Sequence, residues 1–156
     1  MRMHSLRFAS PEGDAEMTTG TYNRPLPLSQ PEWDYYWEKA KQHELWIMRC
    51  DGCNKHYFYP RAICPNCFSR NTRWAQSSGK GTLLGFSIVH RGPTPAFADH
   101  VPYVACIVEL EDGARFASNL VEVEPDPANI KVGMAVEVVF DDVTDSVTLP
   151  KFRPAQ

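Results

Sequence analysis

Four cysteines within 18 residues constrain this chain more than any other feature of its sequence. Cys50 and Cys53 form one Cys-x-x-Cys pair, Cys64 and Cys67 form a second, and ten residues separate the two pairs. Zn²⁺ prefers four thiolates at the corners of a tetrahedron, about 2.3 Å from the metal, and a tight Cys-x-x-Cys turn presents two thiolates on the same side. The two matched pairs therefore predict one zinc ion held by Cys50, Cys53, Cys64 and Cys67.

A site with four thiolates is closed to water and substrate, so the predicted zinc is structural rather than catalytic. Short strands are expected at residues 45–49 and 72–76 on either side of it, which gives a rubredoxin-like zinc ribbon over residues 45–76. Two alternatives remain open. Iron binds four thiolates of this kind as well, and a Cys-x-x-Cys pair is sometimes redox-active, although redox motifs normally use a single pair.

The second half of the chain, residues 77–156, alternates apolar and polar side chains with the period of β-strands. We expect five strands, at residues 80–91, 103–110, 114–121, 134–140 and 146–149. In the first strand Leu84, Phe86 and Ile88 are predicted to face the core. Cys106 lies on the apolar face of the second strand and is predicted to be a buried thiol, not a nucleophile. Five short antiparallel strands fit a closed OB-fold barrel, so the predicted fold class is mainly β.

Residues 25–44, ahead of the ribbon, have the period of a helix that ends near His43. Ser29 and Glu32 have the spacing of a capping box. Aromatic side chains recur along one face of this helix, and they are Trp33, Tyr36 and Trp37. Such a stripe either packs on the protein's own core or anchors a partner subunit. We assign these three residues to a predicted partner interface.

Charge is distributed unevenly along the chain, whose net charge is −3. Residues 45–76 carry +4, from five Lys or Arg against Asp51 alone, whereas residues 77–156 carry −5, from six basic and eleven acidic side chains. OB-folds and zinc ribbons bind single-stranded nucleic acid in other proteins, but this binding requires a positive groove. The acidic barrel therefore disfavours nucleic-acid binding, which we keep only as an alternative function.

Residues 1–24 have no periodicity and are predicted to be a flexible extension. Their apolar side chains form no continuous run, so they lack the pattern of a secretory signal. No run in the chain approaches the ~20 apolar residues that cross a bilayer. Two close cysteine pairs without an export signal are typical of a reducing compartment, and we expect a cytoplasmic protein that does not bind membranes.

Motifs of catalysis are missing from the sequence. It has no Gly-rich phosphate loop, no Gly-x-Ser-x-Gly elbow and no His-Glu-x-x-His helix. His4, His43, His90 and His100 do not lie at a recognisable spacing from a nucleophile. We therefore expect a chain without catalytic residues of its own.

The order of helix, four-cysteine ribbon and barrel, together with several short motifs, resembles a known family. The motifs are Cys-x-x-Cys followed by Cys-Pro-x-Cys, Gly79-Lys80-Gly81-Thr82, Val89-His90-Arg91, Pro102-Tyr103, Val108-Glu109-Leu110, Gly133-Met134-x-Val136 and Pro150-Lys151-Phe152-Arg153-Pro154. Over residues 26–154 the chain resembles the zinc-ribbon, acyl-CoA-associated OB-fold proteins, long catalogued as a domain of unknown function.

This resemblance implies a non-catalytic accessory subunit that docks on a thiolase-fold enzyme, or sometimes on a hydratase, and helps to enclose the acyl-CoA substrate. The catalytic Cys and His would then belong to the partner, in a thiolase, aldolase or acyltransferase complex. The basic ribbon offers cations to the phosphates of coenzyme A. Residues 90–103 form a long, Pro-rich connection that is either functional or a rigid surface loop. Within it, we take Arg91, Phe97 and Tyr103 as predicted acyl-CoA contacts.

Overall fold

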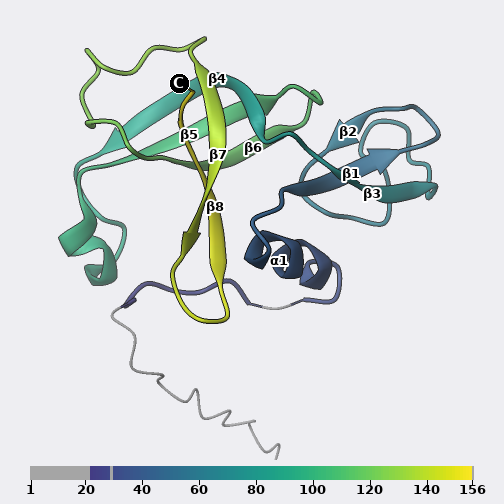
Figure 1. The fold of residues 1–156 in the computed structure, drawn as a ribbon, viewed down its shortest axis with the longest axis horizontal. Coiled ribbons are helices and arrows are strands. Elements are labelled where there is room, and N and C mark those ends of the chain that lie inside the picture. Colours follow the sequence, from purple (N-terminus) through teal and green to yellow (C-terminus); the bar gives the residue numbers. More distant parts are fainter. Residues whose placement is uncertain (1–21, 29, 156) are drawn as a thin grey trace, which may run out of the picture.

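The computed structural model describes residues 22–28 and 30–155, which form a helix, a three-stranded sheet and a barrel (Figure 1). Residues 1–21 of the predicted extension, and Ser29 of the predicted capping box, lie outside the described residues. Helix α1 spans Asp34–Lys41, and its N-cap, Trp33, makes no side-chain capping bond. The helix begins later than the capping-box spacing predicts, after a turn in which the N–H of Trp33 donates to the carbonyl of Gln30 at 2.7 Å.

The ribbon is an antiparallel sheet with the strand order β2-β1-β3. Its strands are β1 (Trp46–Cys50), β2 (His56–Tyr57) and β3 (Thr72–Gln76). Strands β1 and β3 confirm the two strands that the sequence predicts, apart from a shift of one residue in β1. Strand β2 is only two residues long, so no alternation in the sequence reveals it.

The remaining five strands close into a barrel with the order β4-β5-β6-β8-β7. They are β4 (Lys80–Val89), β5 (Tyr103–Leu110), β6 (Arg115–Leu120), β7 (Ala135–Asp142) and β8 (Thr148–Pro154). Neighbouring strands are antiparallel except at the closure, where Leu120 of β6 pairs with Phe152 of β8 in parallel. The predicted mainly β class and the five-stranded OB-fold barrel are confirmed.

The predicted core face of the first barrel strand is partly wrong. Leu83 is fully buried, whereas Leu84, which the sequence places in the core, is 38 % exposed. The register with β5 shifts between Leu83 and Gly85, so that one extra residue enters β4 as a bulge. A bulge of one residue moves the side chains before it to the other face of the strand. Alternation is regular again after the bulge, and Phe86 and Ile88 pack against the core as expected.

The last strand is longer than predicted, because two prolines do not end it. Pro150 and Pro154 pair with residues of β7, although proline normally marks the end of a strand. Both lie two residues from Phe152, so their backbone groups point to the same side of β8 as those of Phe152. The carbonyl of Phe152 accepts a hydrogen bond from the N–H of Val121 on the β6 side. The N–H groups that the prolines lack would therefore point toward β6, and the ladder with β7 stays intact.

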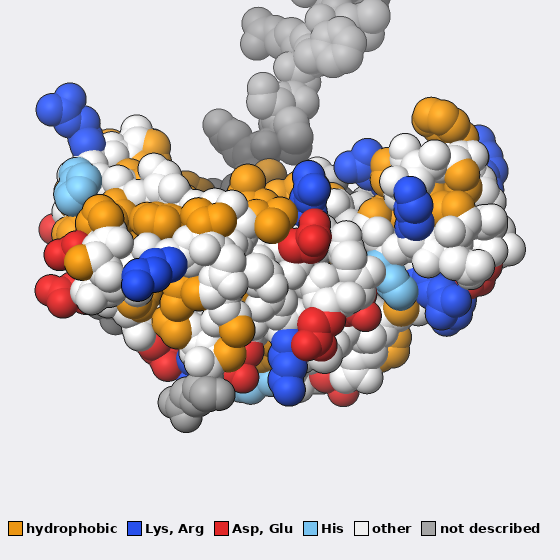
Figure 2. Space-filling view, turned by 90° about the horizontal axis from the view of Figure 1, so that it is seen from above, with side chains coloured by type: hydrophobic (Ala, Val, Ile, Leu, Met, Phe, Trp, Pro, Cys, Tyr) orange, Lys and Arg blue, Asp and Glu red, His pale blue; other side chains and the backbone are white. Residues whose placement is uncertain are grey.

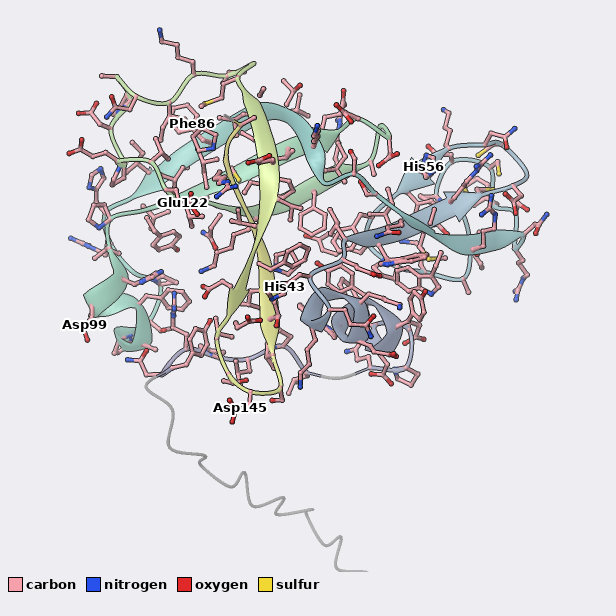
Figure 3. The ribbon with its side chains drawn as sticks, in the orientation of Figure 1. His43, His56, Phe86, Asp99, Glu122 and Asp145 are labelled. Atoms are coloured by element: carbon pink, nitrogen blue, oxygen red, sulfur yellow. The ribbon has the colours of Figure 1, made fainter. Side chains whose placement is uncertain are left out.

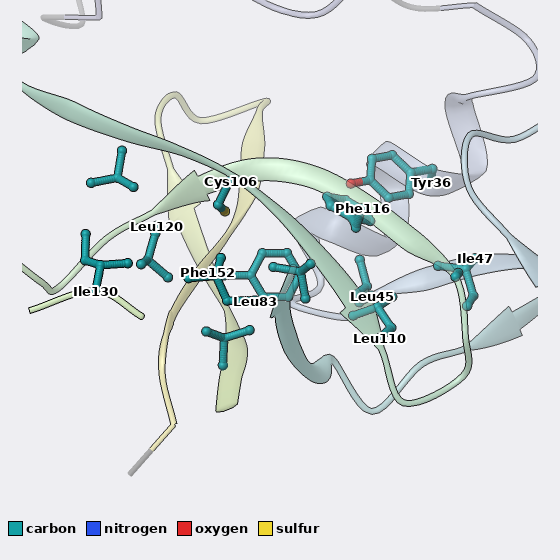
Figure 4. Close-up of a cluster of buried hydrophobic side chains, with 14 residues drawn as sticks. Tyr36, Leu45, Ile47, Leu83, Cys106, Leu110, Phe116, Leu120, Ile130 and Phe152 are labelled. Atoms are coloured by element: carbon teal, nitrogen blue, oxygen red, sulfur yellow. The ribbon is translucent and has the colours of Figure 1, made fainter. Parts of the chain in front are cut away.

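One hydrophobic core joins the helix, the ribbon and the barrel (Figure 4). Tyr36 of α1 lies beside Phe116 of β6 in this core. Strand β1 separates two buried clusters. Ile47, together with Leu45 just before the strand, packs into the barrel core, whereas Met48 and Cys50 belong to a second cluster around the cysteines. Within residues 22–28 and 30–155, no helix combines the length and the apolar character that crossing a bilayer requires.

Candidate metal centre and partner surfaces

The four predicted zinc ligands converge at one place in the ribbon. Their Sγ atoms all lie within 4.8 Å of one another. The distance is 3.6 Å between Cys50 and Cys67, and 3.8 Å between Cys53 and Cys64. A tetrahedron with metal–sulfur bonds of about 2.3 Å has edges of about 3.8 Å, so the thiols fit one tetrahedral metal ion. His56, which the sequence analysis leaves out of the ligand set, is not part of this cluster.

Backbone amides of the second cysteine turn point at its sulfurs. The N–H of Asn66 donates to Sγ of Cys64 at 3.4 Å. Burial on its own raises the pKa of Cys64, but the amides of Asn66 and Cys67 and the adjacent thiols lower it to about 6. Although the N–H of Ser69 lowers the pKa of Cys67, burial and the three other sulfurs raise it to about 12. Thiolates this close together repel one another. A divalent cation bound between them removes the repulsion, and so the site has the chemistry of a metal centre.

The cations of the ribbon fall into two groups. Nε of Arg73 donates to Asp51 at 3.0 Å, and Nε of Arg49 lies 3.8 Å from the same carboxylate. Arg61 and Arg70 are exposed, and no carboxylate among the described residues lies within ion-pair distance of either. Lys and Arg side chains surround hydrophobic ones on the lobe at the right of Figure 2, which is the ribbon. Part of the basic charge of the ribbon is therefore available to a partner.

Of the three predicted partner-interface residues, Tyr36 is placed in the core. Only 2 % of Tyr36 is exposed, its ring centroid lies 5.2 Å from that of Phe58, and burial raises its pKa well above the ordinary value. Trp33 and Trp37 are partly buried and stack on each other with centroids 6.3 Å apart. Only these two tryptophans keep surface that a partner can contact, because the period of the helix turns Tyr36 toward the barrel.

Trp33 and Trp37 form one wall of a groove of about 260 Å³ between α1 and the barrel. The rest of the groove is lined by Tyr36, Phe58, Tyr59, Phe116, Ala117, Ser118, Asn119, Leu149, Pro150 and Lys151. The only charged side chain among them, Lys151, is 12 % exposed and already forms an ion pair with Asp141. The groove is therefore apolar and without free charge. Sequence reasoning missed it, since its walls come from elements that meet only through long-range pairing.

The predicted acyl-CoA contacts are brought together only in part. Phe97 lies on the 3₁₀ helix η1 (Pro95–His100), and its ring centroid is 6.1 Å from that of Tyr103. Gly92 permits this packing, because a Cβ there would lie 2.7 Å from Cβ of Phe97. Arg91 is exposed just after β4. No hydrogen bond or cation–π contact joins Arg91 to either ring among the described residues.

The outer face of β4, β5 and β6 is the face with which OB-folds bind oligonucleotides. Its central row consists of Gly85, Ile107 and Ala117 on neighbouring strands. At the border of this row Arg115 already donates to Glu109 at 3.3 Å. Single-stranded nucleic acids are bound by stacking on aromatic rings and by free cations. The centre of this face offers neither among the described strand residues.

Two family models match adjacent parts of the chain. Residues 37–73 match the rubredoxin-like zinc ribbon domain of ChsH2. Residues 74–141 match the C-terminal OB-fold domain of ChsH2. The border between the two models lies within β3, close to the border of residues 45–76 that the sequence predicts for the ribbon.

Several curated proteins are similar to this chain. A probable enoyl-CoA hydratase alpha subunit of Thermomonospora curvata is 34 % identical over 154 residues, but the chain spans only 47 % of that relative's length. A DUF35 domain-containing scaffold protein of Methanocaldococcus jannaschii is 37 % identical over 129 residues, which cover 77 % of this chain and 89 % of the relative. Among solved structures, a chain titled Ltp2-ChsH2(DUF35) aldolase matches with a TM-score of 0.72 and 34 % identity. The match covers 84 % of this chain and 100 % of that one.

Proposed function

This chain belongs to the family of DUF35 domain-containing scaffold proteins, and from this premise we propose that it is a non-catalytic accessory subunit in acyl-CoA metabolism. In this proposal it docks on a thiolase-fold catalytic subunit and helps to bind or enclose the acyl-CoA substrate. The observation that carries the proposal is the match to the Ltp2-ChsH2(DUF35) aldolase chain, which extends over 100 % of that chain. The hydratase name of the Thermomonospora relative supports chemistry on a CoA thioester.

We assign Cys50, Cys53, Cys64 and Cys67 to one structural Zn²⁺. The sulfur–sulfur distances of 3.6 and 3.8 Å support this assignment, because they fit the edges of a zinc–thiolate tetrahedron. A closed site supplies no chemistry to a substrate; its role is to hold the two turns of the ribbon together. Four reduced thiols also suit the cytoplasm, where we place the protein.

The surfaces available for docking and for substrate differ in charge. Trp33 and Trp37 offer a partner large aromatic anchors beside an apolar groove. The exposed guanidinium of Arg91 lies on the same connection as the packed rings of Phe97 and Tyr103, and it suits a phosphate or carbonyl oxygen of an acyl-CoA. We therefore assign the tryptophans to the partner and the connection between β4 and β5 to the substrate.

Purification of the tagged chain from its own host tests the proposal. We expect a thiolase-fold protein to co-purify in a fixed ratio, and the purified pair to cleave or thiolyse acyl-CoA while the chain alone does not. Arg91→Ala should raise the KM for acyl-CoA about ten- to a hundredfold, since a charge-assisted hydrogen bond contributes roughly 1.5–3 kcal/mol. Lys131→Ala, at an exposed position elsewhere on the barrel, is the matched control.

Three results would contradict the proposal. One is turnover of acyl-CoA by the isolated chain. Another is a stable complex with a catalytic subunit whose KM does not respond to Arg91→Ala. The third is tight, salt-sensitive binding of single-stranded DNA by the isolated chain, which would favour a nucleic-acid-binding protein instead.

A further inference from the structure

The residue that follows each Cys-x-x-Cys pair has a left-handed backbone. It is Asn54 in the first pair, with φ 58°, and Phe68 in the second, with φ 59°. In the second turn, the N–H of Phe68 also donates to the carbonyl of Cys64 at 3.0 Å. Gly and Asn adopt the left-handed region routinely, but a bulky side chain does so at a steric cost. Asn54 is thus ordinary at this position, and Phe68 is not.

Phe68 is also exposed, with 79 % of its surface open to solvent. Ile63, directly before Cys64, is 41 % exposed. The N–H of Cys64 donates to the carbonyl of Ser69 at 2.9 Å, which joins the segments that carry the two side chains. The isolated chain thus gains little burial from a ring at position 68 to offset the strained backbone. A strained, exposed aromatic residue on a rigid turn points to a function.

Two arginines without a carboxylate partner among residues 22–28 and 30–155 flank these apolar side chains in the sequence. Arg61 and Arg70 lie two residues away from Ile63 and Phe68, respectively, and both are exposed. They differ from Arg49 and Arg73, which share the carboxylate of Asp51. Two apolar side chains flanked in the sequence by guanidinium groups that pair with no described carboxylate complement an apolar socket with carboxylates at its border.

We propose that Ile63, Phe68, Arg61 and Arg70 form a docking knob, through which the ribbon inserts into an apolar, acid-bordered socket on the catalytic subunit. This inference rests on the proposed function and adds to it a second contact surface, separate from Trp33 and Trp37. The four-cysteine site gives the knob its rigidity, because Phe68 directly follows Cys67. A rigid aromatic anchor loses little conformational entropy on binding, which is why such residues dominate interface energetics.

The observations favour a protein partner over a single-stranded nucleic acid. Nucleic-acid binding uses a groove in which a row of cations follows the backbone and several rings stack on successive bases. The docking knob has one aromatic ring and two free cations at the end of a turn. The barrel beside the ribbon is acidic, with −5 over residues 77–156.

The decisive experiment replaces Phe68 by a residue that the turn prefers. In Phe68→Gly we expect one zinc per chain and a thermal midpoint equal to or above that of the wild type, because the backbone strain is relieved. The Kd for the purified catalytic subunit that co-purifies with the chain should nevertheless rise at least about 30-fold, as for other central aromatic anchors. The double variant Arg61→Ala, Arg70→Ala should slow association and weaken its dependence on salt.

Asn54→Gly is the matched control, since it makes the corresponding change in the first turn. Its Kd should stay within about twofold of the wild type, as expected for a surface position outside the interface. If the wild-type chain binds the subunit and Phe68→Gly binds it equally well, the docking knob is refuted while the accessory function stands. If no catalytic subunit co-purifies, both fail together. If Phe68→Gly instead loses affinity for a fluorescent single-stranded DNA that the wild type binds tightly, the knob serves nucleic acid and the inference is wrong.

Discussion

Phe58 of the ribbon stacks on Phe116 of the barrel, with ring centroids 4.3 Å apart and 20° between the ring planes. Tyr36 of α1 packs against both rings, at 5.2 and 6.5 Å. We call these three residues the aromatic joint. Because the joint draws one ring from each part of the chain, helix, ribbon and barrel stabilise one another there.

Removal of one ring should therefore weaken all three parts. For Phe58→Ala we expect a loss of roughly 3 kcal/mol in the free energy of unfolding, from lost burial and lost ring contacts. Tyr59→Ala, next in the chain but 44 % exposed, should cost less than about 1 kcal/mol. Urea unfolding monitored by tryptophan fluorescence measures both. Equal losses in the two variants would mean that the ribbon and the barrel do not depend on this contact.

Replacement of a metal ligand should be far more damaging. Cys64→Ser should abolish zinc binding and unfold the ribbon, since metal-linked folding contributes ~10 kcal/mol or more. Cys106→Ala should keep one zinc per chain, because Cys106 is buried in the barrel and takes no part in the cysteine cluster. Elemental analysis and amide spectra of both proteins decide this. A well-folded Cys64→Ser protein would exclude a structural metal, and a coloured wild-type protein would indicate iron.

The bulge in β4 predicts that alanine substitutions at two adjacent leucines change the stability by very different amounts. Leu83→Ala should destabilise the barrel by about 2–5 kcal/mol, because it opens a cavity at a fully buried position. Leu84→Ala should change the stability by no more than about 1 kcal/mol, since that side chain is 38 % exposed. Thermal or urea unfolding of the two variants is the measurement. The reverse order of stabilities would show that β4 runs without the bulge.

The contact between helix and barrel at His43 should make the stability of the fold depend on pH in the acidic range. His43 lies between α1 and the β7–β8 hairpin (Figure 3), with Nε2 3.0 Å from Oδ2 of Asp142. A bond from the hydroxyl of Thr148, at 2.5 Å, and the bond to His43 lower the pKa of Asp142. A carboxylate with a lowered pKa in the folded state stabilises the fold above its ordinary pKa of about 3.9. That stabilisation is lost as the pH falls through the lowered value.

Asp142→Asn should consequently reduce stability at neutral pH and flatten its decline below about pH 4. Asp145→Asn, at an exposed position in the same hairpin, is the control and should leave the neutral-pH stability unchanged. Urea midpoints measured from pH 2 to 7 provide the comparison. Parallel pH profiles for wild type and Asp142→Asn would show that Asp142 does not contribute to the loss of stability at low pH.

The features that the sequence predicts best are those set by local patterns. The spacing of Cys50, Cys53, Cys64 and Cys67 reflects the geometry of two tight turns, and β5 runs over residues 103–110 as its alternation predicts. The position of Tyr36 needed the tertiary structure, because the helical period shows which residues share a face but not which of them meets the barrel.

Errors arise where a distant strand decides the outcome. The bulge at Leu84 depends on the register with β5, and the sequence of β4 alternates plausibly in either phase. Pro150 and Pro154 stay within β8 only because their missing N–H groups face β6. The sequence does not predict a role for Phe68, because neither its left-handed backbone nor its exposure follows from a pattern of residue types.

Strand β1 has one face in the barrel core and the other against the cysteine cluster, through Ile47 and Cys50 respectively. This arrangement limits how the two parts can be recombined in evolution or by design. A ribbon transplanted from another protein would have to supply side chains that fit a foreign barrel as well as its own metal turns. Lineages of such proteins should therefore inherit ribbon and barrel as a matched pair, with substitutions at Ile47 accompanied by compensating changes in the barrel core that it packs against.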